Sequence, residues 1–146
     1  MSLTSPIKEY RISSPYGKRI LNGKEQFHDG IDFVSLTNDK TVGAITAGIV
    51  CLDVDYYEES KRWTDKRHSA GNYVIIKHII EDKLYYVRYI HLGVNYCYEG
   101  QEVEKGEPVG VYADVGYSFG PHLHQDAFNS KWKKIDPSFM LKLMGD

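Results

Sequence analysis

Apolar and aromatic residues recur along this chain in short runs with the period-2 signature of β-strands. Tyr73–Ile80 is the clearest run, and a charged turn at Glu81–Lys83 separates it from a second run, Leu84–Ile90. Such a pair predicts an antiparallel hairpin. Val42–Val54 is rich in β-branched residues around two glycines and predicts further strand.

Helical periodicity is weak throughout the chain. Only Asp136–Leu141 suggests a short terminal turn. Glycines punctuate the second half and bound segments of strand length, namely Gly93, Gly100, Gly106, Gly110, Gly116 and Gly120. The chain therefore predicts an all-β protein, mainly antiparallel, with short connections.

One stretch departs from this rhythm. Tyr56–Ala70 is polar and charged and shows no strand alternation. We expect a surface loop that is longer than a simple hairpin turn. Loops of that length often serve as binding elements.

The size of 146 residues fits a single domain. We expect residues 1–10 to form an N-terminal extension and residues 11–146 to form the domain. The formal net charge of −2 provides no basic field for nucleic acid. No apolar run approaches the ~20 residues that span a bilayer. The N-terminus shows no basic segment followed by an apolar one, so no signal peptide is predicted.

The two cysteines, Cys51 and Cys97, lie too far apart for a C-x-x-C motif. A single pair also makes no disulfide framework. We interpret both as partly buried small hydrophobic side chains.

Candidate chemistry begins with two histidines near the C-terminus. His122 and His124 are two positions apart, so a strand would present both imidazoles on one face and Leu123 on the other. Both could reach one metal ion, or one could bind it while the other lies a few ångströms away. Pro121 suits the first residue of that strand.

A histidine and a carboxylate lie near the N-terminus. His28 and Asp32 are four positions apart, which places them on one face of a strand or of a helix. Gly30 between them argues against a helix interior. We therefore expect an extended segment with Ile31 and Phe33 on the opposite face.

A third histidine, His91, follows the run that ends at Ile90. Strict alternation would place it on the same face as Tyr89 and Val87. A polar imidazole that closes a buried strand needs a hydrogen-bond partner or a task. The other two histidines, His68 and His78, are expected to have no catalytic role.

Together these segments suggest a zinc site, because Zn²⁺ accepts imidazole nitrogen and carboxylate oxygen. Three protein ligands would leave one position for water, which is the arrangement of a catalytic metal. A hydrolase is therefore the first hypothesis. Gly116–Gly120 also fits the G-x-S-x-G nucleophile elbow, but that motif needs a long helix after it, and Pro121 and a strand-like segment follow.

The motifs resemble, in this order, those of the lysostaphin-type (LytM-like) zinc metallopeptidases. They are His28-x-x-x-Asp32, Tyr89-Ile90-His91-Leu92 and Gly120-Pro121-His122-Leu123-His124. The flanking blocks that also match are Ser13–Arg19, Phe27–Phe33, Ala47–Val50, Gly71–Ile76 and Gly100–Glu107. The likeness runs from about Arg11 to Pro137.

The resemblance implies one zinc ion per chain, held by His28, Asp32 and His124. It implies that His91 and His122 flank the reacting water, one as general base and the other at the developing oxyanion. The family's fold is a twisted antiparallel sheet, or distorted sandwich of the duplicated-hybrid-motif kind, with a groove over the metal. Its members are mostly endopeptidases that cut peptides of bacterial peptidoglycan, so we expect this substrate and an extracellular, cell-envelope or phage-virion location.

The chain departs from the family in three places. Gln125-Asp126-Ala127-Phe128 follows His124 where the family usually has an aromatic residue and a Glu. Cys51–Ala70 is longer than usual, and Phe119 replaces a small residue. The rival interpretations are an inactive module of this fold that binds peptidoglycan or a partner, and a swinging-arm carrier domain built around Gly100–Gly106.

Overall fold

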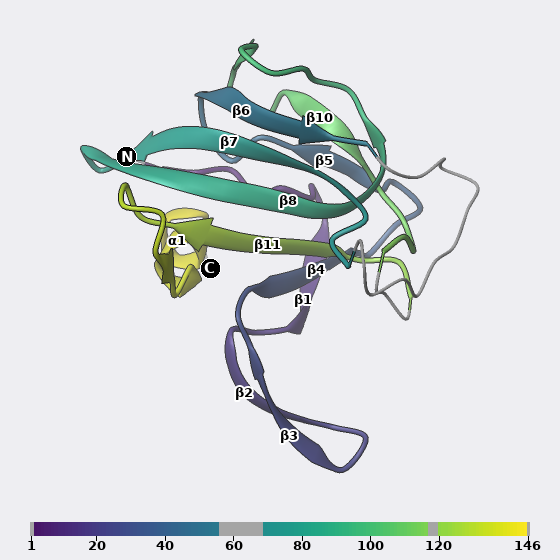
Figure 1. Ribbon diagram of the computed structural model, residues 1–146. Helices are drawn as coiled ribbons and strands as arrows, with labels where there is room; N and C mark the ends of the chain where they lie inside the picture. The colour runs from purple at the N-terminus through teal and green to yellow at the C-terminus, as the bar shows by residue number, and fades with distance from the viewer. Residues whose placement is uncertain (1, 56–68, 117–119, 146) are drawn as a thin grey trace.

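The computed structural model describes residues 2–55, 69–116 and 120–145, and most of them lie in strands (Figure 1). The strands are β1 (Tyr10–Ser14), β2 (Gly17–Leu21), β3 (Lys24–His28), β4 (Ile31–Ser35), β5 (Thr41–Gly43), β6 (Gly48–Val54), β7 (Asn72–Ile80), β8 (Lys83–Asn95), β9 (Glu102–Val103), β10 (Pro108–Tyr112), β11 (Leu123–Phe128) and β12 (Lys134–Ile135). One short helix, α1 (Ser138–Leu143), lies where a terminal turn was predicted. The predicted all-β class is confirmed. The loop expected at Tyr56–Ala70 falls mostly outside the described residues, as does Phe119.

Ten strands form one twisted sheet in the order β1-β4-β11-β8-β7-β6-β9. Off this path, β10 pairs with β5 and β8, and β12 pairs with β11. The strand pairs in the described residues are antiparallel. The order brings an N-terminal strand, β4, beside a C-terminal one, β11.

The hairpin of β7 and β8 confirms the clearest prediction from the sequence. Glu81 and Asp82 have φ values of 50° and 66°, so both turn residues are left-handed, as a two-residue type I′ turn requires. The returning strand continues past Ile90 to Asn95. Val42–Val54, where further strand was predicted, contains two strands, β5 and β6.

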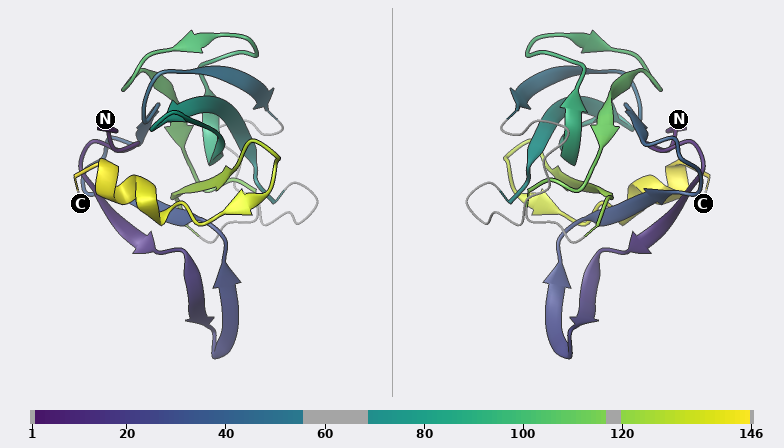
Figure 2. Two further views of the ribbon diagram at one scale, coloured as in Figure 1. Left: turned by 90° about the vertical axis from the view of Figure 1, so that its left-hand side faces the viewer. Right: turned by 90° about the vertical axis from the view of Figure 1, so that its right-hand side faces the viewer.

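A second hairpin, formed by β2 and β3, projects from the body as a two-stranded ribbon (Figures 1 and 2). Its turn is Asn22-Gly23, with φ values of 52° and 76°. Asn-Gly is the strongest short signal for a type I′ turn. Strand β3 ends at His28, so the ribbon delivers this side chain to the sheet.

The core lies on the face of the sheet that carries Phe33, Val87 and Leu123, each of them fully buried. Residues ahead of β1 also contribute, because Leu3 and Ile7 belong to the same apolar cluster. The Leu3 amide donates to the Leu143 carbonyl at 2.9 Å, so the two ends of the chain meet, as Figure 2 shows. The domain boundary expected at residue 10 stays a prediction.

Both cysteines are free thiols, Cys97 buried and Cys51 partly buried, which confirms their interpretation as small hydrophobic residues. Across the part of the chain that the structure describes, the helical content offers nothing with the length and apolar character of a membrane span.

Candidate metal centre

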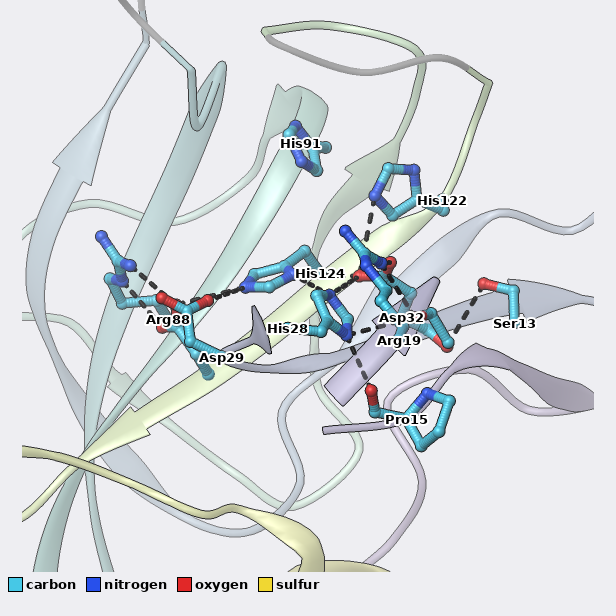
Figure 3. Close-up of polar contacts among 12 residues, drawn as sticks. Ser13, Pro15, Arg19, His28, Asp29, Asp32, Arg88, His91, His122 and His124 are labelled. Atoms are coloured by element: carbon cyan, nitrogen blue, oxygen red, sulfur yellow. Dashed lines mark hydrogen bonds and ion pairs between the residues drawn. The ribbon is translucent and has the colours of Figure 1, made fainter. Parts of the chain in front are cut away.

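Two ligand candidates lie directly opposite each other on neighbouring strands. Asp32 in β4 pairs with His124 in β11, so both side chains project from the same face of the sheet. The Nδ1 atom of His124 lies 2.9 Å from Oδ1 of Asp32. The His28 Nε2 atom, at the end of β3, lies 3.2 Å from the same oxygen and 3.3 Å from that Nδ1 (Figure 3).

A glycine makes this approach possible. The expected extended segment is two strands, β3 and β4, joined at Asp29-Gly30, and the side chains of His28 and Asp32 converge across this junction. A Cβ atom at Gly30 would lie 2.5 Å from Nε2 of His124 and 2.7 Å from the Gln125 carbonyl oxygen. Gly30 therefore leaves room for the His124 ring.

Hydrogen bonds fix which nitrogen of each ring faces the centre. The His28 Nδ1–H group donates to the Pro15 carbonyl at 2.9 Å, so Nε2 carries the lone pair. The His124 Nε2–H group donates to Oδ2 of Asp126 at 3.2 Å, which directs Nδ1 to Asp32. Two nitrogen atoms and one carboxylate oxygen thus converge on a single point.

This point attracts positive charge. Burial alone would raise the pKa of Asp32, but hydrogen bonds with His124 and His28 hold it well below its usual range. Burial disfavours a charged His124, yet its bonds to Asp126 and Asp32 raise its pKa to about 9. A proton or a metal cation can supply that charge.

The donor set fits one divalent metal ion. The three donor atoms group within 4.8 Å of one another. Metal–ligand bonds of ~2.0–2.1 Å in a tetrahedron require donor atoms about 3.3 Å apart. The observed separations of 2.9, 3.2 and 3.3 Å match this requirement closely.

His91 lies at a β-bulge. Strand β8 pairs with β11 through Ile90 and with β10 from Leu92 onward, and the β7 register skips His91 between them. His91 has a φ of 67°, and its ring centroid lies 4.7 Å from that of His122. The prediction that His91 shares a face with Tyr89 and Val87 is therefore wrong, because the extra residue of the bulge reverses the alternation.

His91 and His122 present the same nitrogen to the centre. Their Nδ1–H groups donate to the carbonyls of Val115, at 2.8 Å, and Gly120, at 2.9 Å. In this tautomer each Nε2 carries a lone pair, and that of His122 lies 3.7 Å from Oδ1 of Asp32. Burial, together with the imidazoles of His122 and His124, lowers the pKa of His91 to about 3, so His91 is neutral. Strand β11 begins at Leu123, so His122 directly precedes it.

Asp126 is a part of the site that the sequence analysis treated only as a departure from the family. It is fully buried and accepts the hydrogen bond of His124. The signal was available, because the period-2 pattern that pairs His122 with His124 continues to Asp126. A second possible metal group, Asp29, His124 and Asp126, is already neutralised, since the Lys134 ammonium lies 2.9 Å from Asp29 and 3.3 Å from Asp126.

An open cavity of about 570 Å³ adjoins the donors on the side of the β2–β3 ribbon. Asp32 and His122 form part of its wall, and Arg19 faces them with its guanidinium 3.8 Å from Oδ2 of Asp32. The cavity also has apolar walls at Ile20 and Val34. A substrate can therefore reach the donor atoms from solvent.

The histidines expected to lack a catalytic role are His78 and His68, and His68 lies outside the described residues. His78 is fully buried, donates from Nδ1 to the Ala47 carbonyl and accepts from the Tyr89 hydroxyl at 2.9 Å. Ser118 of the G-x-S-x-G sequence is also outside the described residues. Strand β11, and no long helix, follows Gly120, so this part of the chain lacks the elbow geometry.

The sequence of residues 26–137 matches the profile of Peptidase family M23. This match covers all five of the residues discussed above as ligand or catalytic candidates. The chain belongs to peptidase family M23. Membership in this metallopeptidase family implies a metal ion, and the His28, Asp32 and His124 group offers donors for it.

Relatives of this M23 peptidase support the assignment. The chain is 30% identical over 141 residues, 94% of its length, to an uncharacterized metalloprotease of Haemophilus influenzae. It is 31% identical over 121 residues, 81% of its length, to the peptidoglycan DD-endopeptidase ShyA of Vibrio cholerae. The chain spans only 26% and 25% of the length of these two relatives.

Two solved peptidase structures have a fold similar to that of this chain. The catalytic domain of lysostaphin from Staphylococcus simulans superposes with a TM-score of 0.69 at 27% identity, covering 91% of this chain and 92% of that one. A zinc-containing peptidase from Vibrio cholerae gives a TM-score of 0.69 at 26% identity, covering 99% of this chain and 40% of that one.

Proposed function

We propose that this M23 peptidase is a zinc metalloendopeptidase that hydrolyses peptide bonds of bacterial peptidoglycan. The observation that carries the proposal is the convergence of His28, Asp32 and His124 at donor separations of 2.9 to 3.3 Å. Two imidazoles and one carboxylate are a ligand set of catalytic zinc sites, with one coordination position left open.

When bound, a zinc ion would act as a Lewis acid that polarises the scissile carbonyl and makes water nucleophilic at neutral pH. Asp32, His28 and His124 would hold it, and the Asp32 carboxylate would balance part of its charge. The bonds of His28 to Pro15 and of His124 to Asp126 keep each ring in the tautomer that a metal needs.

His91 and His122 are proposed as the catalytic pair. Both rings are anchored through Nδ1, so each can accept a proton at Nε2 or, once protonated, donate a hydrogen bond from it. Their ring centroids lie 4.7 Å apart, close enough to act on the same reacting group. One would take the proton of the attacking water and the other would stabilise the oxyanion.

The relatives and the cavity support the proposed substrate class. ShyA is named a peptidoglycan DD-endopeptidase, and its match covers 81% of this chain. The open cavity beside Asp32 and His122 can admit an extended peptide from solvent. With this substrate, we expect the protein to act at the cell envelope, outside the cell or in a phage virion.

The test is digestion of purified sacculi of several cross-link types, with the soluble products identified by mass spectrometry. Zinc-loaded protein is expected to release fragments in which one peptide bond has gained the elements of water, and a chelator is expected to stop the release. The Asp32→Ala variant serves as the inactive control. Bound zinc without peptide cleavage on any of these walls would contradict the proposal and leave a binding module of this fold.

A further inference from the structure

Next to His124, Asp126 forms ion pairs with Arg88 and Lys134, two cations that have no part in the proposed function. Asp126 is fully buried, and both of its carboxylate oxygens accept hydrogen bonds, Oδ1 from Arg88 and Oδ2 from Arg88 and His124. A buried carboxylate is costly unless it is paired and fully hydrogen-bonded. The presence of this carboxylate two residues after His124, on the same face of β11, therefore requires an explanation.

The register of the sheet supplies the partner. Asp126 in β11 lies directly opposite Arg88 in β8. The Arg88 guanidinium donates two hydrogen bonds to the Asp126 carboxylate. Nε donates to Oδ1 and a terminal nitrogen donates to Oδ2, each at 2.7 Å. A bidentate pair of this kind fixes the plane of the carboxylate as well as its position.

That fixed carboxylate determines how His124 is presented. Oδ2 of Asp126 accepts the Nε2–H of His124 at 3.2 Å, whereas the nearest oxygen of Asp29 lies 3.7 Å away. Among the described residues, Asp126 is thus the one acceptor within hydrogen-bond distance of this nitrogen. With Nε2 held by Asp126, Nδ1 is the nitrogen left to bind a metal ion, and it faces Asp32 and His28.

Lys134 extends the group to the other half of the site. Its ammonium lies 3.3 Å from Asp126 and 2.9 Å from Asp29, the residue that follows His28. The ion pairs join β8, β11 and β12 to the junction of β3 and β4 (Figure 3 shows Arg88 and Asp29 on the side of His124 away from Asp32). Two cations face two carboxylates, so the group is formally neutral and adds no competing charge to the centre.

We infer that Arg88 and Asp126 are positioning residues, which hold His124 in the tautomer and orientation that a metal ion requires. Lys134 connects this pair to Asp29, beside His28, through its two ion pairs. The inference rests on the proposed function, because it assumes that His124 is a ligand. A merely structural ion pair would stabilise the fold and leave the affinity for metal unchanged.

The test compares zinc dissociation constants, measured by competition with a chelating dye, for wild-type protein and four variants at neutral pH. Asp126→Asn keeps the shape of the side chain, and Arg88 keeps some access to solvent when its partner is neutral. Arg88→Met removes the cation, and Arg88→Lys keeps the charge without the bidentate grip. Val87→Ala is the control, since it weakens the core beside Arg88 on the opposite face of β8.

We expect Asp126→Asn and Arg88→Met to bind zinc about 10–100-fold more weakly, Arg88→Lys to lie between them and wild type, and Val87→Ala to match wild type. The ligand-field bands of the cobalt-loaded protein should change in the first two variants.

Variants that fold, as judged by circular dichroism, and bind zinc and cobalt as wild type does would overturn the inference and leave the proposed function intact. If the wild-type protein itself bound neither ion, the proposed function and the inference would fail together. Loss of affinity in Val87→Ala equal to that in Asp126→Asn would assign the effect to stability and would also overturn it.

Discussion

At the scale of single residues, the site depends on which nitrogen each imidazole presents. His28 and His124 are held with opposite nitrogens facing the centre, because the Pro15 carbonyl accepts a hydrogen bond from Nδ1–H of His28 and Asp126 accepts one from Nε2–H of His124. His91 and His122 are both anchored through Nδ1. The four imidazoles thus have two proposed roles: His28 and His124 bind the metal, and His91 and His122 act on the reacting groups.

Substitution separates these roles. His91→Ala and His122→Ala should retain zinc at one ion per chain and lose about 10²–10⁴-fold in peptide hydrolysis, because each removes only a proton-transfer or oxyanion group. His124→Ala should lose the metal itself. Metal analysis beside the sacculus assay checks this. Zinc lost from His122→Ala and kept by His124→Ala would reverse the assignment.

His78 gives the fold a dependence on pH. Burial lowers its pKa to about 4, below the 6.5 of an exposed imidazole, so between these values the unfolded chain binds a proton that the folded protein does not. Stability should therefore fall as the pH drops through this window, by about 3 kcal/mol in total. Urea unfolding of wild type and His78→Gln at pH 7, 5.5 and 4.5 measures it. Equal losses in the two proteins would contradict the prediction.

Residue types alone identified the candidates but left their roles open. Alternation places His122 and His124 on one face and gives no reason to choose between them, so the choice of His124 came from the resemblance to known peptidases. The structure adds the reason: β11 sets His124 opposite Asp32, and His122 precedes the strand. Asp126 was predictable by the same alternation, but its partner Arg88 depends on the register with β8.

At the scale of elements, two irregularities shape the site. The bulge at His91 lies where β8 exchanges β11 for β10 as its partner, and it turns the imidazole out of the core toward His122. A period-2 pattern carries no signal for such a bulge, so the sequence placed His91 on the wrong face. The β7–β8 hairpin was predictable because its alternation and turn are local.

The second irregularity is the junction of β3 and β4 at Gly30. Gly30→Ala should weaken zinc binding about 10–100-fold, because the added methyl group would displace the His124 ring and the Gln125 carbonyl. The control is Gly100→Ala, whose Cβ meets no atom within 4 Å. Its φ of 87° should cost about 1–2 kcal/mol of stability with no loss of zinc affinity. Calorimetric zinc titration compares them, and equal affinities would contradict the prediction.

At the scale of the whole molecule, the sheet order unites segments from the two ends of the chain. His28 and His124 are 96 positions apart, yet their ring nitrogens lie 3.3 Å apart because β4 and β11 are neighbours. Strand order of this kind is set by long-range pairing, so the sequence alone did not supply it; the resemblance grouped the three ligands but gave no strand order. The projecting β2–β3 ribbon then forms one wall of the cavity beside the donors.

The central claim is that one metal ion is shared by the N-terminal pair and the C-terminal histidine. Diffraction from crystals of zinc-loaded wild-type protein, recorded at the zinc absorption edge, tests it most directly. We predict a single anomalous peak about 2.0–2.2 Å from Nε2 of His28, Oδ1 of Asp32 and Nδ1 of His124. A peak bound instead by His91 and His122, or the absence of any peak among these side chains in zinc-saturated crystals, would contradict the account.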